Sequence, residues 1–338
     1  MAVFIQQRFA LLILIAIPLI FVQFNVSGQE TSIHTVDGPI KTSELGFALT
    51  HEHVMSNFGK AIDSTSVYAE NELFGQVIPY LKQLKAFGVD AIFDCTTAYF
   101  GRRVDLLKTI SDSSDIHIIT NTGIYGGAND RYIPKFAYEN DASFISRIWI
   151  DEFENGIEKT GIKPGFIKLA FDAGTPSEID RKLFEAGLLT HLKTGLTLAV
   201  HTADNLEAVQ LQLKLLEEYQ VHPSAWVWVH ANKHSDDAEL LATASKGTWI
   251  SLDGANVSNL EEYIAKIQKF KANGLLHKIL LSHDGNGFPA GGTIRKFDAI
   301  IKELIPNLLS NGLTKKEIDQ IMVQNPRDAF AISIRTSK

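Results

Sequence analysis

The sequence of 338 residues has a single cysteine and no run of basic residues. Cys95 alone cannot form an intrachain disulfide, and its place in the apolar stretch Ala91–Cys95 is typical of a small buried hydrophobe. The formal net charge of −7, without clustered Lys and Arg, argues against nucleic acid as a partner. Low-complexity segments and an interdomain linker are also lacking, which favours a single domain after the N-terminal segment.

Long apolar runs are lacking too, except at the N-terminus. Phe9–Phe24 is nearly all apolar, Arg8 precedes it, and Val26–Gly28 offers the small residues that a signal peptidase reads. The alternative is an uncleaved anchor, but this run is shorter than the roughly twenty residues of a spanning helix. We therefore expect residues 1–28 to be a signal peptide and residues 29–338 to be an exported domain, periplasmic or secreted, without stable membrane insertion after cleavage.

From position 45 onward, short β-rich runs alternate with amphipathic stretches. Such alternation predicts parallel strands joined by right-handed helical crossovers, and eight such units predict a closed (β/α)8 TIM barrel. The strands are expected at Gly46–Thr50, Ala91–Thr96, Ile116–Thr122, Gly165–Ala170, Leu196–Val200, Ala225–Val229, Thr248–Leu252 and Lys278–Ser282.

Helical patterns lie between and after these strands. They cover Asn71–Phe87, Ile179–Lys193, Asn205–Tyr219, Asp236–Ser245, Asn259–Ala272, Thr293–Ser310 and Lys315–Gln324. Asp204 and Asp236 are expected to cap two of them, and Pro326 to end the last one. A turn at Val36–Pro39 predicts a short N-terminal β-hairpin ahead of the barrel.

Potential metal ligands stand at the carboxyl ends of several predicted strands, where such barrels build active sites. His51 and His53 are two residues apart on a strand, so both should face the barrel interior. His201 and His230 each follow a strand, in equivalent positions. Asp284 follows the eighth strand, where a carboxylate can bind a metal and hold the proton of a metal-bound water. Any one of these residues could instead be an ordinary polar group at a strand end, but together they predict a metal site.

Lys168 lies among apolar neighbours in the predicted strand Gly165–Ala170. Lysine is almost never fully buried without a partner, and divalent ions would repel a bare ammonium. Two interpretations resolve this conflict. Either the amine reaches the rim and pairs with a carboxylate, or it reacts with carbon dioxide to give an anionic carbamate that bridges two metals. Of the other histidines, His283 is assigned to packing by strand alternation, and His234 could face the pocket.

The chain resembles the phosphotriesterase family of the amidohydrolase superfamily from about Thr35 to Phe330. The resemblance rests on Thr35–Ile40 followed by Gly46–His53, on Gly165–Lys168 and on Ser282–Asp284. It implies a binuclear centre, usually zinc, and is compatible with a homodimer. His51, His53 and Asp284 would bind the more buried ion, and His201 and His230 the more exposed one. Carbamylated Lys168 and a hydroxide would bridge both ions.

Catalytic roles follow from the same resemblance. The metal-bridging hydroxide would attack a small ester or lactone, and Asp284 would take the proton and pass it outward. Tyr125 resembles a pocket tyrosine of the lactonase branch that could orient the substrate; its alternative is an ordinary aromatic at the top of the barrel.

Departures from the family pattern concern the substrate rather than the metals. Gly254 stands where phosphotriesterases have His and lactonases have Arg, the segment after His230 lacks their acidic residues, and Gly285–Gly292 is short where lactonases have a long loop. We expect Phe58, Tyr125 and Phe288 to line an open pocket for a small molecule. The alternatives are a phosphotriester or amide hydrolase and, outside enzymes, a metal-binding barrel without catalysis.

Overall fold

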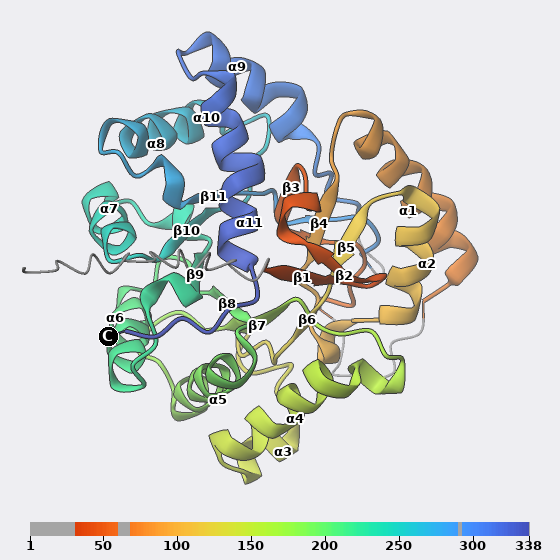
Figure 1. Ribbon diagram of the computed structural model, residues 1–338, viewed down its shortest axis with the longest axis vertical. Coiled ribbons are helices and arrows are strands. Elements are labelled where there is room, and N and C mark those ends of the chain that lie inside the picture. The colour runs from red at the N-terminus through yellow and green to blue at the C-terminus, as the bar shows by residue number, and fades with distance from the viewer. Residues whose placement is uncertain (1–30, 60–67, 290–292, 338) are drawn as a thin grey trace, which may run out of the picture. The chain divides into compact units, whose positions relative to one another are not determined.

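The strands of the domain form its centre and the helices surround them (Figure 1). The computed structural model describes residues 31–59, 68–289 and 293–337. The predicted signal peptide, residues 1–28, lies outside the described residues. No helix in these described ranges is both long and apolar enough to cross a membrane.

The barrel strands pair in parallel within two sheets, ordered β12-β3-β4-β5 and β6-β7-β8-β9-β10-β11. Thr120 alone separates β5 from β6, and residues 282–284 separate β11 from β12, so each pair is one interrupted strand. The chain therefore continues from one sheet to the other at both interruptions. The predicted (β/α)8 architecture is confirmed. The strands are β3 (Ala48–His53), β4 (Ala91–Asp94), β5 (His117–Ile119), β6 (Asn121–Thr122), β7 (Phe166–Ala170), β8 (Thr197–His201), β9 (Trp226–Val229), β10 (Trp249–Leu252), β11 (Ile279–Leu281) and β12 (Gly285–Asn286).

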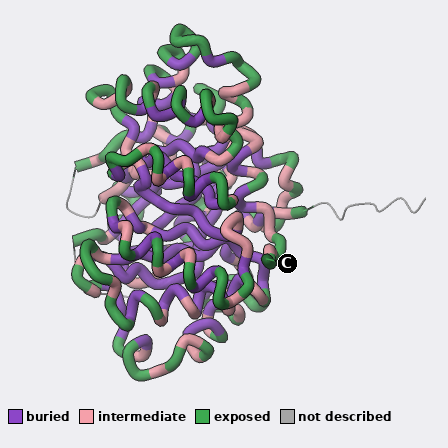
Figure 2. Tube along the Cα trace, turned by 90° about the vertical axis from the view of Figure 1, so that its left-hand side faces the viewer, coloured by how far each residue is buried: buried purple, intermediate pink, exposed green. Residues whose placement is uncertain are grey.

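The helices that cover the strands are amphipathic, with apolar residues on the buried side. They are α1 (Glu70–Ala86), α2 (Val104–Ser114), α3 (Lys135–Glu139), α4 (Ala142–Asn155), α5 (Glu178–Thr194), α6 (Leu206–Glu218), α7 (Asp237–Ser245), α8 (Leu260–Ala272), α9 (Ile305–Ser310), α10 (Lys315–Asp319) and α11 (Asn325–Phe330). Figure 2 shows burial concentrated in the central strands and exposure on the outer helices.

Alternation along the strands divides the buried apolar side chains between two cores. Ile167 and Leu169 of β7 belong to the layer between strands and helices, whereas Phe166 belongs to the barrel interior with Phe93 and Phe330. Lys168 shares the parity of Phe166, so the same alternation directs it to the interior. The position of this lysine therefore follows from strand geometry.

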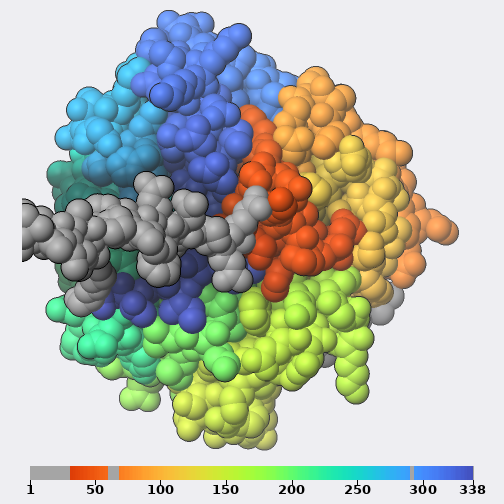
Figure 3. Space-filling model, viewed as in Figure 1, coloured from red at the N-terminus to blue at the C-terminus, as the bar shows by residue number. Residues whose placement is uncertain are grey.

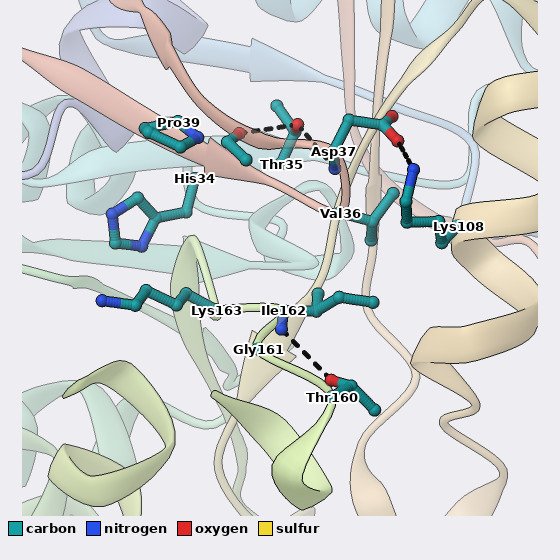
Figure 4. Close-up of a pocket in the computed structure, with 11 residues that line it drawn as sticks. His34, Thr35, Val36, Asp37, Pro39, Lys108, Thr160, Gly161, Ile162 and Lys163 are labelled. Carbon is teal, nitrogen blue, oxygen red and sulfur yellow. Dashed lines mark hydrogen bonds and ion pairs between the residues drawn. The ribbon is translucent and has the colours of Figure 1, made fainter. Parts of the chain in front are cut away.

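The predicted hairpin is present as β1 (Ser32–Thr35) and β2 (Gly38–Lys41), which pair antiparallel. Ile33 contributes to the interior core, and the backbone N–H of Val36 donates to Ile118 at 2.9 Å. In Figure 3 the hairpin segment, coloured red, lies beside the blue C-terminal helices. The hairpin therefore packs against the barrel and is part of the same domain.

Three local predictions are wrong. The helix expected from Thr293 begins only at Ala299, because Arg295 instead exchanges backbone hydrogen bonds with Asn286. Asn205, not Asp204, caps α6, since its side chain accepts from the N–H of Ala208 at 3.1 Å.

The last helix does not end at Pro326. A π-helical turn, Gln320–Gln324, joins α10 to α11, and the helical backbone continues through Pro326 to Phe330. Asn325 anchors this junction, because its side-chain amide donates to Leu276 and to Ile279 at 2.9 and 2.7 Å.

Candidate metal centre

All six predicted metal ligands and Tyr125 line one pocket of about 200 Å3. The pocket lies where β3, β7, β8, β9 and β11 end, which is the edge that parallel barrels use for active sites. Its remaining walls come from loops that follow the strands. The residues lining it are His51, His53, Ser56, Phe58, Phe100, Tyr125, Lys168, His201, His230, Lys233, Asp284 and Arg295.

His51 and His53 both approach the carboxylate of Asp284. The Nε2 atoms of the two imidazoles lie 3.6 and 3.3 Å from Oδ1 of Asp284. The ring of His53 is held through its other nitrogen, because its Nδ1 is 2.8 Å from the hydroxyl of Thr96. Nδ1 of His51 lies 3.3 Å from Asp253 without a hydrogen bond between them. A partner such as Thr96 fixes the tautomer of a metal-binding imidazole and leaves Nε2 free for the ion.

His201 and His230 form the second half of the site. Their ring centroids are 4.5 Å apart, and His230 is 4.8 Å from His51. Burial holds the pKa of both imidazoles well below its usual value, and the positive charge of Lys168 lowers it further. Both rings are therefore neutral near pH 7, as a metal ligand must be.

Lys168 is only 1% exposed and lines the same pocket as these histidines. Its Nζ donates to the carbonyl of Leu169 at 3.3 Å and lies 5.5 Å from the ring centroid of Tyr125. Burial lowers the pKa of the amine. A rim lysine paired with a carboxylate would be partly exposed, so this geometry argues against that interpretation.

Asp284 ends the eighth strand in an uncommon conformation. Its φ is +51°, and His230 at the end of β9 has a φ of +60°, both in the left-handed region that L-residues seldom adopt. Burial alone would raise the pKa of the Asp284 carboxyl, but the hydrogen bond from His53 and the charges of the histidines bring it well below its usual range. Asp284 is therefore ionised near pH 7.

Tyr125 stands between the histidines and an aromatic wall. Its hydroxyl is 3.4 Å from Nδ1 of His201, and its ring contacts Phe58 and Phe100 at centroid distances of 6.2 and 5.2 Å. Burial raises the pKa of the phenol, so Tyr125 keeps its proton and can donate to a substrate. Phe288, expected in this wall, packs on Tyr68 instead and does not line the pocket.

Asp253 is the main site residue that sequence reasoning missed. Its Oδ2 accepts from the backbone N–H of His230 at 2.8 Å and lies 3.7 Å from Nδ1 of the same residue. Its Oδ1 accepts from Ser251 at 2.7 Å. Asp253, His51 and His230 satisfy the distances of a metal-binding group, as do His51, His53 and Asp284. Because both oxygens already accept hydrogen bonds, Asp253 is better suited to orient His51 and His230 than to bind an ion.

The remaining histidine predictions have different outcomes. His283 is turned away from the pocket, as expected, with Nδ1 2.7 Å from Glu52 and Nε2 accepting from the N–H of Ile300. His234 does not line the metal pocket, because its Nδ1 pairs with Asp204 at 2.5 Å beside a neighbouring hollow.

The donor set fits a divalent metal ion. Imidazoles and carboxylates are the ordinary ligands of zinc, and the four histidines and Asp284 supply five such groups around one small space. Burial alone would lower the pKa of His51, but Cys95 and Asp253 raise it well above its usual value, so this ring would release a proton when it binds an ion. His51, His53 and Asp284 lie close enough together to share an ion, and His201, His230 and Lys168 line the same pocket.

Comparisons with known proteins agree with this fold and site. The model of the phosphotriesterase family matches residues 31–330. A phosphotriesterase homology protein of Mycobacterium tuberculosis is 27% identical, over 88% of this chain and 97% of its own length. An aryldialkylphosphatase of Saccharolobus solfataricus is 25% identical, over 86% of this chain and 97% of its own length.

A solved structure also shares the fold. It is a mutant organophosphorus hydrolase of Deinococcus radiodurans, with a TM-score of 0.80 and 22% identity, covering 89% of this chain and 98% of its own. The family match spans nearly all of the described domain. The chain therefore belongs to the phosphotriesterase family of metal-dependent hydrolases.

Proposed function

We propose that this protein is an exported hydrolase with two divalent zinc ions that cleaves a small carboxyl ester or lactone. The observation that carries the proposal is the convergence of four imidazoles, the Asp284 carboxylate and a buried lysine in one pocket. When bound, the ions would lower the pKa of a water molecule and polarise the substrate oxygen. His51, His53 and Asp284 would hold one ion, and His201 and His230 the other.

The protein's own side chains have distinct parts in this proposal. Asp284 is ionised and can accept the proton of the attacking water. Tyr125 keeps its hydroxyl proton and can orient the substrate. The Lys168 amine, with its lowered pKa, can react with carbon dioxide to form a carbamate and release a proton, which would give both ions a shared anionic ligand.

Two features favour an ester or lactone over a phosphotriester. Gly254 cannot carry a proton outward from Asp284, and neither Asn232 nor Lys233 has a carboxylate that could continue such a path. The aromatic wall of Tyr125, Phe58 and Phe100 suits a planar carbonyl substrate. The phosphotriester remains a second candidate, because one relative is named for the hydrolysis of aryl dialkyl phosphates.

We expect kcat/KM for the best lactone or carboxyl ester to exceed that for any phosphotriester by at least about tenfold, roughly 1.4 kcal/mol in transition-state binding. A panel of lactones, aryl esters, amides and phosphotriesters, assayed on zinc- and cobalt-loaded protein, measures this. Tyr125→Phe should slow lactone hydrolysis while metal content stays near two ions per chain. A phosphotriester as the fastest substrate would refute the assignment, and loss of metal in Tyr125→Phe would make that residue structural.

Export is a separate part of the proposal and rests on the sequence of residues 1–28. Cleavage after Gly28 predicts a mature protein that begins at Gln29 or within a few residues of it. Mass spectrometry of the protein from its native source, together with cell fractionation, measures the terminus and the compartment. An intact Met1 in a membrane fraction would establish an anchor instead of a signal peptide.

A further inference from the structure

Two cationic side chains stand at the metal pocket without a role in binding metal. Lys233 follows β9 and Arg295 follows β12, and both line the same space as the predicted ligands. Lys233 is exposed and has no ion-pair partner among the described residues. Arg295 approaches Asp284, with 3.8 Å between Nη2 and Oδ1, and its side chain is 57% exposed.

The charge of this pocket is opposite to that of the whole chain. The formal net charge is −7, yet among the described residues that line the pocket Asp284 is the only acid. Asp284 is already engaged by His51 and His53 at 3.6 and 3.3 Å. Arg295 therefore shares the Asp284 carboxylate with the two histidines, and Lys233 has no ion-pair partner among the described residues, so positive charge is in excess at this pocket. A cleft with an excess of one sign of charge concentrates ligands of the other sign.

A neighbouring hollow has the opposite character. It has a volume of about 670 Å3 and shares His201 and Lys233 with the metal pocket, but Asp172, Asp204 and Glu207 line it. These carboxylates disfavour an anion there. An anionic group next to Lys233 would therefore bind on the side of the metal pocket.

The aromatic residues and Lys233 come from different parts of the barrel, while Arg295 follows the eighth strand, which pairs with the first. Phe58, Phe100 and Tyr125 follow the first three strands, β3, β4 and β6, whereas Lys233 follows β9, the sixth. In a closed ring of eight strands the sixth lies across from the second. A substrate that reaches both groups would therefore span the metal centre.

The position of Arg295 is fixed by its backbone. Its carbonyl accepts from the N–H of Asn286 at 2.7 Å, and its own N–H donates to Asn286 at 3.0 Å. This antiparallel bridge holds residue 295 beside the eighth strand. The guanidinium is thereby kept at the pocket while its exposed end stays available to a ligand.

We propose that the natural substrate is a small acyl compound that carries an anionic group of the carboxylate type, bound by Lys233 and Arg295, with its apolar part against the aromatic wall. This inference rests on the proposed function and names its substrate class. It makes Lys233 and Arg295 specificity-determining residues of the pocket.

The test compares two esters with the same leaving group: para-nitrophenyl hemisuccinate, which is anionic, and its neutral methyl ester. We expect zinc-loaded protein to favour the anion in kcat/KM by at least about tenfold, with a preference that weakens as salt is added. Lys233→Met and Arg295→Met should each lower the ratio of the two kcat/KM values about tenfold, mainly through KM. Lys233→Arg should restore the ratio, and the distant Lys246→Met is the matched control.

The outcomes separate this inference from the proposed function. Hydrolysis of both esters with a ratio that Lys233→Met and Arg295→Met leave unchanged would overturn the substrate class and keep the hydrolase. If neither ester is hydrolysed, the proposed function fails for esters, and calorimetric titration with monomethyl succinate decides the inference. Binding that is at least about fivefold weaker in Lys233→Met than in Lys246→Met supports it, and equal binding overturns it.

Discussion

Lys168→Ala is expected to leave fewer than two ions per chain and to lower kcat/KM at least about a hundredfold. The reason is that Lys168 is buried to 1% exposure among the predicted ligands, where only its carbamate would supply an anion to both ions. Elemental analysis of gently purified protein, together with ester turnover, measures both effects. A short-chain carboxylic acid such as propionate should restore part of the activity, because its carboxylate can take the place of the carbamate.

The experiment must distinguish the loss of side-chain packing at position 168 from the loss of metal binding. Lys168→Met fills much of the same volume without an amine, so it controls for the cavity that alanine would leave. We expect Lys168→Met to fold with wild-type stability in the metal-free state and still to lack the second ion. Full metal content and an unchanged rate in both variants would show that Lys168 is structural.

Glu52→Ala is expected to destabilise the metal-free protein by about 3–5 kcal/mol. Glu52 is fully buried, and Oε1 accepts from the hydroxyl of Ser282 at 3.0 Å and from the backbone N–H and Nδ1 of His283 at 3.0 and 2.7 Å. Oε2 accepts from the N–H of Gly285 at 2.7 Å. Alanine would leave these donors buried without a partner where the first and eighth strands pair.

Chemical denaturation of the metal-free protein measures this change. Glu52→Gln is the matched control, since its amide oxygen can replace Oε1 but its NH2 group opposes the N–H of Gly285, and we expect a loss of about 1–3 kcal/mol. Glu52 lies between His51 and His53 on β3 and projects from the other face of the strand. A free energy of unfolding of Glu52→Ala within about 0.5 kcal/mol of wild type would contradict the role assigned to Glu52.

The strands and their inward-facing side chains could be predicted because alternation along a strand determines which residues face the barrel interior. Alternation along Phe166–Ala170 directs Lys168 inward, and the same rule directs His51 and His53 to one side of β3 and His283 away from the pocket. Strand ends gather at one edge of a parallel barrel, so ligands far apart in sequence were expected to meet. His201 and His230 illustrate this, with ring centroids 4.5 Å apart.

Residues in loops could not be placed in this way. Asp253 follows β10 as an ordinary turn residue in the sequence, and only the fold shows that its carboxylate reaches His51 and His230. Arg295 falls in a stretch with helical periodicity, but its backbone pairs with Asn286 and delays the helix to Ala299. Backbone pairing between separate segments overrides the helical periodicity of the local sequence. The spacing of residues along the chain does not predict such pairing.

The left-handed backbone at His230 and Asp284 places a conformational cost at two strand ends of the pocket. A non-glycine residue in this conformation costs on the order of 1 kcal/mol, and glycine would adopt it without that cost. The chain therefore carries this conformational cost at two positions whose side chains line the pocket. Backbone strain of this kind is concentrated at functional sites, so its presence at two strand ends of the pocket supports the assignment of that pocket as the site.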